Sequence, residues 1–136
     1  MRRLIYASRY TGEAALSDAL RHIVGKSIHN NRIVDVTGFL LAGDGAFLQW
    51  LEGPAASVAE TFERIGKDPR HGDLTILSDG DAPTRQFRDW NMGQRQLGVE
   101  DRGMLAEAGL AGFSPATMDA MTAERLLILA GGRHAR

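Results

Sequence analysis

A tight turn in the first half of the chain constrains the fold more than any other feature. Asp44-Gly45 separates two apolar runs, residues 36–41 and 47–51, and glycine accepts the positive φ angle that a turn between paired strands requires. Alternation along the second run places Gln49 on the same face as apolar neighbours. A buried amide needs partners for two donors and an acceptor. Gln49 is therefore either an incidental polar residue or part of a polar site.

Composition and charge exclude several classes of function. The chain has 136 residues, 43% hydrophobic and 24% charged, which is typical of one globular domain. A formal net charge of −1 gives no reason to expect binding to nucleic acid or to a membrane. There is no cysteine, and the four histidines lack metal-ligand spacing, so neither thiol chemistry nor a metal site is expected. Without a long apolar segment, we expect a soluble, cytoplasmic protein.

The remaining periodicity predicts an α+β fold. Further strands are expected at residues 4–8, 74–77 and 85–92, and helices at residues 13–28 and from residue 54 until Pro69 stops the second one. The order β-α-β-β-α-β-β contains the ferredoxin-like arrangement with an added strand, in an antiparallel or mixed sheet with both helices on one face.

The C-terminal part is expected to cover the other sheet face, which carries Leu48 and Trp50. It contains a short helix candidate at residues 100–108 and a longer one from residue 114 to the glycine pair at 131–132. We therefore predict a core domain over residues 1–97 and a helical extension over residues 98–136. The extension has more consecutive apolar residues than one sheet face can bury, so part of it should meet another element or a second subunit.

Two more polar groups of residues have alternative interpretations. Asn30-Asn31 stands where the first helix is expected to end, and it is either a helix C-cap or part of a polar site. The charged run at residues 64–71 follows the second helix and is usually a solvated helix end. Trp90 and Met92 lie two residues apart on the last expected strand, so they are predicted to share a face.

Five blocks of the sequence resemble one known family in the same order. The blocks are LIYASR, SIHNNRIVDVTGFLL, FLQWLEGP, IGKDPRH and RQFRDWNMG. They resemble the BLUF family of blue-light sensors that bind FAD, over about residues 3 to 93. The resemblance implies a noncovalent flavin between the two helices, with FAD as the expected form and FMN or riboflavin as alternatives.

The resemblance also implies site residues. In that family a tyrosine hydrogen-bonds a glutamine that bonds the flavin, and these roles fall on Tyr6 and Gln49. The residues with implied photochemical roles are Tyr6, Ser8, Gln49, Trp90 and Met92. The residues implied to bind the cofactor are Tyr6, Ser27, Asn30, Asn31, Gln49, Arg64, Asp68, Arg70, His71 and Met92.

These roles imply a photoreceptor without turnover. Blue light would move an electron and a proton from Tyr6 to the flavin, and the Gln49 amide would rotate or tautomerise to give a red-shifted state. The alternative is a small ferredoxin-like hydrolase of the acylphosphatase type. No glycine-rich loop precedes the first helix, and the arginines follow the second, which opposes that alternative.

The expected output is a protein interaction. No catalytic domain follows the five blocks in this sequence, so we expect a signal relayed to a downstream partner protein. We also expect self-association through the sheet face or the C-terminal helix. No interaction with nucleic acid or membrane is expected.

Overall fold

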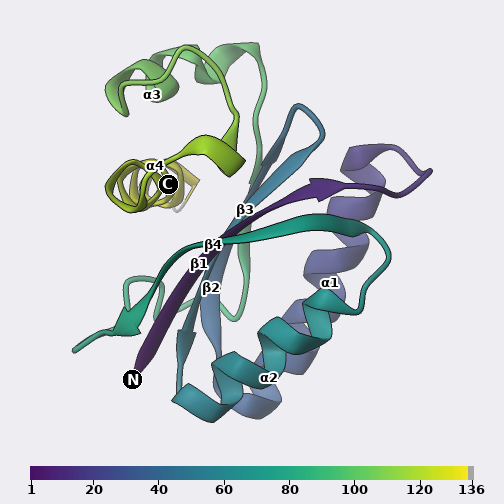
Figure 1. Ribbon diagram of the computed structural model, residues 1–136, viewed down its shortest axis with the longest axis vertical. Coiled ribbons are helices and arrows are strands. Elements are labelled where there is room, and N and C mark those ends of the chain that lie inside the picture. Colours follow the sequence, from purple (N-terminus) through teal and green to yellow (C-terminus); the bar gives the residue numbers. More distant parts are fainter. Residues whose placement is uncertain (135–136) are drawn as a thin grey trace.

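The computed structural model describes residues 1–134 as a sheet with helices on both faces (Figure 1). Over this range the first elements are β1 (Arg2–Tyr10), α1 (Leu16–Val34), β2 (Thr37–Gly43), β3 (Ala46–Gly53), α2 (Ala55–Gly66), β4 (His71–Asp81) and β5 (Gly93–Gln96). The C-terminal part adds the 3-10 turns η1 (Val99–Asp101) and η2 (Pro115–Thr117) and the helices α3 (Arg102–Glu107) and α4 (Ala120–His134).

The five strands lie in the order β4-β1-β3-β2-β5. Neighbouring strands are antiparallel except β2 and β5, which are parallel, so the sheet is mixed. Helices α1 and α2 lie on one side of the sheet in Figure 1, and α3 and α4 lie on the other. This is the α+β, ferredoxin-like arrangement that the sequence predicts, with the added strand at the edge beside β2.

The turn between β2 and β3 fixes the register at the centre of the sheet. Asp44 and Gly45 both have positive φ angles, of 47° and 72°, as a two-residue turn between twisted strands requires. The predicted hairpin is therefore confirmed. On the other side of β3, β1 pairs so that Tyr6 lies opposite Gln49. Both residues belong to strands whose alternate side chains face α1 and α2.

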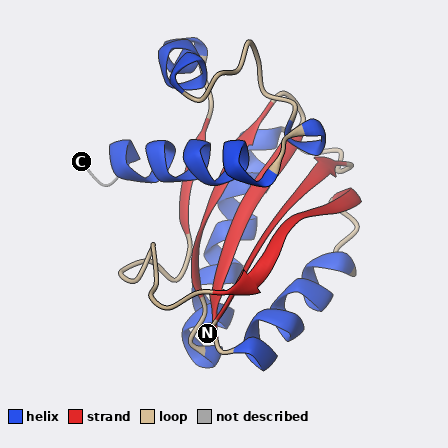
Figure 2. Cartoon of the chain, turned by 60° about the vertical axis from the view of Figure 1, so that its left-hand side comes forward, coloured by secondary structure: helices blue, strands red, loops and turns tan. Residues whose placement is uncertain are grey.

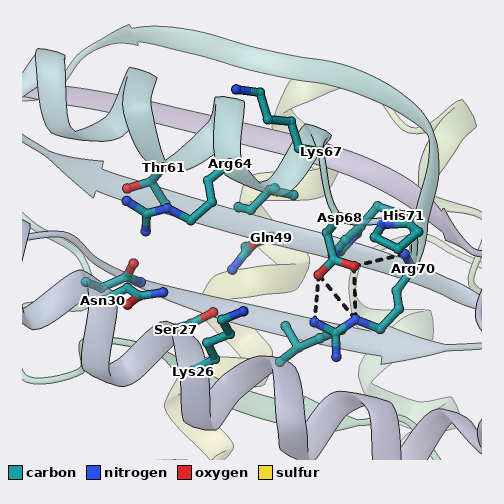
Figure 3. Close-up of a pocket in the computed structure, with 14 residues that line it drawn as sticks. Lys26, Ser27, Asn30, Gln49, Thr61, Arg64, Lys67, Asp68, Arg70 and His71 are labelled. Atoms are coloured by element: carbon teal, nitrogen blue, oxygen red, sulfur yellow. Dashed lines mark hydrogen bonds and ion pairs between the residues drawn. The ribbon is translucent and has the colours of Figure 1, made fainter.

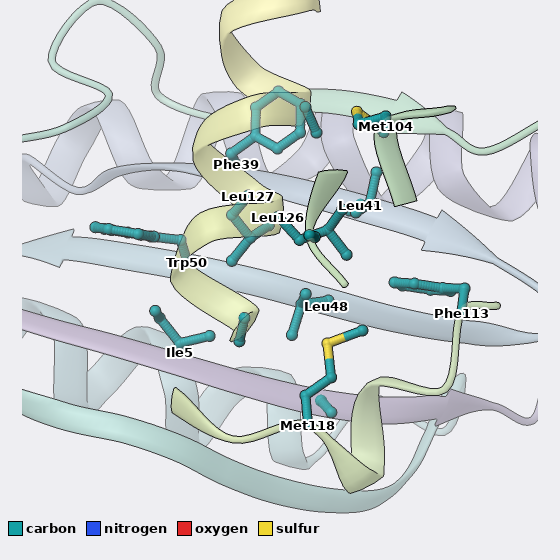
Figure 4. Close-up of a cluster of buried hydrophobic side chains, with 14 of the residues drawn as sticks. Ile5, Phe39, Leu41, Leu48, Trp50, Met104, Phe113, Met118, Leu126 and Leu127 are labelled. Carbon is teal, nitrogen blue, oxygen red and sulfur yellow. The ribbon is translucent and has the colours of Figure 1, made fainter. Parts of the chain in front are cut away.

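The C-terminal part covers the opposite sheet face, as predicted. Figure 2 shows α4 running across the strands. Its Leu126 and Leu127 are fully buried in a cluster with Leu48 and Trp50 (Figure 4). The adjoining Ile128 is 40% exposed, because the apolar run spans more of the helix circumference than the sheet covers.

A polar contact also joins α4 to the first strand. The Nη1 atom of Arg3 lies 3.0 Å from the Oε1 atom of Glu124 on α4. The guanidinium carbon of Arg3 lies 5.1 Å from the centre of the Trp50 ring, within the range of a cation–π interaction. The first strand and the last helix thus contact the same buried tryptophan.

The ends of the last helix differ from the prediction. Residue 114 precedes the short turn η2, and α4 begins only at Ala120, where the Asp119 carboxylate accepts a hydrogen bond from the Thr122 backbone N–H at 2.7 Å. An aspartate in this position caps the helix as a serine would. The glycine pair at 131–132 does not end the helix, which continues to His134.

The predicted strand at residues 85–92 is wrong. These residues form an irregular segment between β4 and β5. The backbone N–H groups of Gln86 and Phe87 bind the Glu52 carboxylate instead of a neighbouring strand. Trp90 and Met92 consequently do not share a face, because Trp90 packs with the cluster under α4 and Met92 with the cluster under α1 and α2.

Other boundaries extend beyond the predicted ones. Helix α1 ends at Val34 rather than at residue 28, and Asp35 follows it in the left-handed conformation with φ 62°. Asn30-Asn31 is therefore not a C-cap. Strands β1 and β4 are both longer than predicted, since their paired backbones continue to residues 10 and 81.

We expect the Leu127→Ala variant to lose about 2–5 kcal/mol of unfolding free energy. Leu127 is fully buried between α4 and the sheet, so its truncation leaves a cavity. Urea denaturation followed by circular dichroism would measure the loss. Ile128→Ala is the matched control, because that side chain is 40% exposed and should cost clearly less. Equal losses in the two variants would contradict the packing described here.

Candidate functional site

A cavity of about 480 Å³ lies between α1 and α2 over the sheet (Figure 3). Its walls come from both helices, from β3 and from the segment that joins α2 to β4. Cavities of this size are typical of sites for small molecules and cofactors. Eight of the residues predicted from the sequence to bind a cofactor line it: Ser27, Asn30, Asn31, Gln49, Arg64, Asp68, Arg70 and His71.

A buried chain of hydrogen bonds lies at the floor of the cavity. The Tyr6 hydroxyl donates to the Oε1 atom of Gln49, and the Nε2 atom of Gln49 donates to the Met92 sulfur at 3.2 Å. Tyr6, Gln49 and Met92 are all at least 96% buried. The two neighbours hold the Gln49 amide in one orientation, with its oxygen toward the phenol and its nitrogen toward the thioether.

The environment of Tyr6 keeps its phenol protonated. Complete burial raises the pKa of Tyr6, and the negative charge of Asp68 raises it further. The Tyr6 ring also meets the Phe62 ring edge-on, at a centroid distance of 5.3 Å. A phenol in these surroundings gives up its proton only to a partner within the protein or to a bound ligand.

Helix α1 supplies amides to a second wall. Asn30 and Ser27 lie on the cavity side of the helix, and Asn31 is 98% buried. The Nδ2 atom of Asn31 donates to the Asn91 backbone carbonyl at 2.9 Å, and the Asn91 amide donates to the Val36 carbonyl at 3.2 Å. Asn31 therefore connects α1 to the segment that carries Met92.

Charged residues gather at one end of the cavity. The Arg70 guanidinium binds both carboxylate oxygens of Asp68, with the shortest contact at 2.7 Å. This pairing lowers the pKa of Asp68 and raises that of Arg70. Arg70 also lies 2.7 Å from the Nδ1 atom of His22 on α1, and so links the α2–β4 segment to that helix.

His71 and Ser8 form a neutral pair beside this charged end. The Ser8 hydroxyl lies 2.9 Å from the Nδ1 atom of His71, and both side chains are at least 91% buried. Burial lowers the pKa of His71; the nearby Arg70 lowers it further, and Asp68 opposes the shift.

The structure does not bring Trp90 to the cavity. Its ring lies on the opposite sheet face, 6.1 Å from the Phe87 ring at an interplanar angle of 15° and 5.7 Å from the Phe39 ring. Of the last-strand pair predicted from the sequence, only Met92 contacts Gln49.

Some cavity residues were not predicted from the sequence. Lys26, Thr61 and Lys67 also line it. Lys26 precedes Asn30 by one helical turn, so the spacing of four along α1 could have indicated it. Lys67 lies within the charged run after α2, but nothing in the sequence separates it from its solvated neighbours.

Two further classes of function find no support in the described part of the chain. Among the residues that the structure describes, no group of three or more His, Asp or Glu side chains could hold a metal ion. None of the described helices is both long and apolar enough to cross a membrane.

Comparison with known proteins assigns the first two thirds of the chain to a sensor family. The BLUF family model, described as sensors of blue-light using FAD, matches residues 1–93. The photoactivated adenylate cyclase subunit beta of Euglena gracilis is 32% identical over 93 residues, which are 68% of this chain and 11% of that protein. The chain thus spans about a tenth of the length of that relative.

Two other proteins match over more of their own length. The blue light- and temperature-regulated antirepressor BluF of Escherichia coli is 31% identical over 105 residues, covering 77% of this chain and 26% of that protein. The solved structure titled BlsA photo-activated state has a TM-score of 0.84 and 28% identity, and covers 94% of each chain. The BlsA ground state gives a TM-score of 0.82, covering 93% of this chain and 87% of that one.

We expect the stability of the protein to depend on His71 below neutral pH. Because the pKa of His71 is lower in the folded than in the unfolded chain, its contribution is complete above about pH 6.5 and is lost as pH falls through the folded-state value. The unfolding free energy of the wild type should therefore fall more steeply below about pH 6.5 than that of His71→Gln. The wild type and His71→Gln both keep the exposed His22 and His29, so these two histidines contribute equally to the two curves. Parallel curves of unfolding free energy against pH would contradict the prediction.

Proposed function

Because the chain belongs to the BLUF family of blue-light sensors that use flavin, we propose that it is a photoreceptor with FAD bound noncovalently in the cavity between α1 and α2. The observation that carries the proposal is the chain from Tyr6 through Gln49 to Met92 at the floor of a 480 Å³ cavity. A glutamine amide held between a phenol and a thioether can present either of its ends to a ligand above it.

The donor set of the cavity fits a flavin. The edge of an isoalloxazine ring presents carbonyl acceptors and an N–H donor, which amides can match with paired hydrogen bonds. Gln49 from β3 and Asn30 and Asn31 from α1 supply these amides. The hydrogen bonds to the ring are also the means by which a protein adjusts flavin electronics.

The cationic side chains of the cavity wall favour a flavin with phosphate. Lys26 and Arg64 lie at the cavity wall and are exposed, so they can meet a diphosphate that extends toward solvent. Arg70 is already paired with Asp68, and we propose that together with His71 it shapes the part of the cavity next to that pair. FAD is the proposed form, with FMN and riboflavin as the alternatives that extraction would distinguish.

We propose that Tyr6 and Gln49 carry the light reaction. A bound flavin would supply the absorption of blue light and an acceptor for one electron and one proton from Tyr6, both of which return to Tyr6 before the cycle ends. Burial raises the pKa of Tyr6, so the phenol keeps its proton in the dark, and we propose that the proton leaves only once the ring gives up an electron. When the phenol no longer donates, the Gln49 oxygen loses its partner, and the amide is released to rotate or tautomerise.

The proposed switch changes the contact with Met92. In the arrangement described here, the Gln49 nitrogen faces the sulfur of Met92. A rotated amide would turn its oxygen toward that sulfur, which cannot donate a hydrogen bond. Met92 would then move, together with the segment that carries it. The proposed switch also includes Ser8, which contacts the cavity residue His71. It includes Trp90 as well, whose ring stacks on Phe87 in the segment that carries Met92.

We propose a signalling module without turnover, with residues 98–136 as its output extension. Relatives carry the same module in a cyclase subunit and in an antirepressor, so the output of the family is set by what the module contacts. In this chain α4 packs on β3, the strand that carries Gln49. We propose that this extension relays the signal to a partner protein or to a second copy of the chain.

We expect the purified wild type to be yellow and to show a reversible red shift under blue light. Tyr6→Phe removes only the hydroxyl, and Gln49→Leu removes every hydrogen bond of that side chain. Both variants should retain flavin and lose the red shift, as measured by absorption before and after illumination. A colourless wild type that takes up no added flavin would refute the proposed function. A normal photocycle in either variant would refute the role of that residue.

We expect Asn31→Ala to weaken flavin binding by about five- to thirtyfold, since one or two hydrogen bonds contribute about 1 kcal/mol each. Arg70→Ala should also weaken it, because it leaves the Asp68 carboxylate unpaired near the proposed phosphates. Fluorescence titration of the apoprotein with FAD would measure both effects. Arg21→Ala is the control, because Arg21 is exposed on α1 and pairs only with Asp18 among the described contacts. Equal affinity in all three variants would place the flavin elsewhere.

A further inference from the structure

The position of Met92 depends on a long irregular segment. Residues 82–92 connect β4 at one edge of the sheet to β5 at the other. The segment belongs to no strand. In its last part the Trp90 carbonyl accepts from the Gly38 N–H at 3.1 Å, the Trp90 N–H donates to the Phe87 carbonyl at 3.1 Å, and the Asn91 carbonyl accepts from Asn31. Its first part begins with the Ala82 N–H bound to the Met1 carbonyl at 2.8 Å and is held further along by side chains.

A buried carboxylate on β3 binds that first part. Glu52 is fully buried on the sheet face opposite the cavity. Its carboxylate accepts hydrogen bonds from the backbone N–H groups of Gln86 at 2.8 Å and Phe87 at 2.7 Å. The Thr37 hydroxyl donates to it at 3.0 Å, and the Trp50 indole donates at 3.1 Å. All four groups around the carboxylate are therefore donors.

The Thr37 hydroxyl in this cluster can donate its proton only toward Glu52. Arg85 donates to the Thr37 oxygen at 2.9 Å, so the Thr37 proton points to Glu52. Arg85 also donates to the backbone carbonyl of Asp35 at 2.8 Å. The carboxylate of Glu52 is thus held by neutral donors, and the neighbouring Arg85 guanidinium donates to Thr37 and Asp35 instead.

Strand β3 holds the same segment at two points, on opposite faces. Gln49 contacts Met92 on the cavity face, and Glu52 contacts Gln86 and Phe87 on the α4 face. Between these points the Phe87 ring stacks on Trp90. Hydrogen bonds to a carboxylate are about twice as strong as neutral ones, whereas a thioether is a weak acceptor. The Glu52 contacts, together with the binding of Arg85 to Asp35 and Thr37, therefore hold the first part of the segment, and the weaker Met92 contact depends on that position.

We infer that Glu52 is a positioning residue for the switch, whose carboxylate anchors residues 82–92 so that the Met92 sulfur meets the Gln49 amide. This inference rests on the proposed function. When the anchor is weakened, Met92 is no longer held at Gln49. The return from the illuminated state, which has to restore that contact, then becomes slower.

Glu52→Gln tests the inference with nearly unchanged shape. Its amide nitrogen would face two of the four donors, so at least one of the anchoring contacts is lost. We expect the variant to retain flavin and its dark recovery to slow by at least about fivefold, as loss of about one hydrogen bond implies. Absorption after a blue-light pulse measures the rate. Unchanged recovery would overturn the inference.

Glu124→Gln is the matched control. Glu124 is an acid on α4 that pairs with Arg3 over the same sheet face, and its described contacts do not include residues 82–92. Its recovery should stay within about twofold of the wild type. Equal slowing in both variants would indicate a general loss of packing on this face and would overturn the specific role of Glu52.

A second comparison separates positioning from stability. If Glu52 acts through Met92, adding Glu52→Gln to Met92→Ala should change recovery by less than about twofold. A further fivefold slowing in that background would overturn the inference. If Glu52→Gln does not retain flavin, Thr37→Val removes one donor and should slow recovery by about fivefold; recovery within about twofold of the wild type would overturn the inference too. A wild type without any red shift would instead refute the proposed function.

Discussion

The pairing of β1 with β3 in one register is the constraint on which the candidate site depends. In this register Tyr6 lies opposite Gln49, and both side chains point toward α1 and α2. Because side chains alternate along a strand, a slip by one residue would move either of them to the other face. The turn at Asp44-Gly45 sets how β3 follows β2, and the apolar alternation keeps β3 in place. The turn thus fixes β3 against β2, and the pairing of β1 with β3 then determines which two polar groups are buried together.

Strand β3 contributes side chains to the hydrophobic clusters on both faces of the sheet. Its odd-numbered residues 47, 49 and 51 face the cavity side, and residues 48, 50 and 52 face α4. A change at Gln49 therefore acts on the strand whose reverse face contacts the C-terminal extension. Such a strand can transmit a small displacement without a continuous path of side chains, since packed interiors shift between discrete arrangements.

The sequence was sufficient for the parts of the fold that follow from local pattern. The turn, the two helices on one face and the apolar cover of Trp50 were all predictable, and the resemblance indicated the residues around the cavity. Residues 85–92 were not, because their alternation is like that of a strand while their N–H groups bind the distant Glu52. The length of α1 was missed for a similar reason: Asn31 satisfies its amide on Asn91, sixty residues away, instead of capping the helix. Partners remote in sequence leave no local signal.

The contact between the first strand and the last helix has a consequence for synthesis. The sheet centre is complete in sequence at Gly53, but the cover of the face that carries Trp50 comes later in the chain and is completed by α4, at residues 120–134. At about 5–20 residues per second, a ribosome needs on the order of 4–16 s to make the intervening chain. During this interval the nascent chain presents an uncovered apolar face, which is the kind of surface that chaperones bind and that aggregates when crowded. The contact of Arg3 with Glu124 joins nearly the two ends of the chain, so it cannot form before residue 124 has been made.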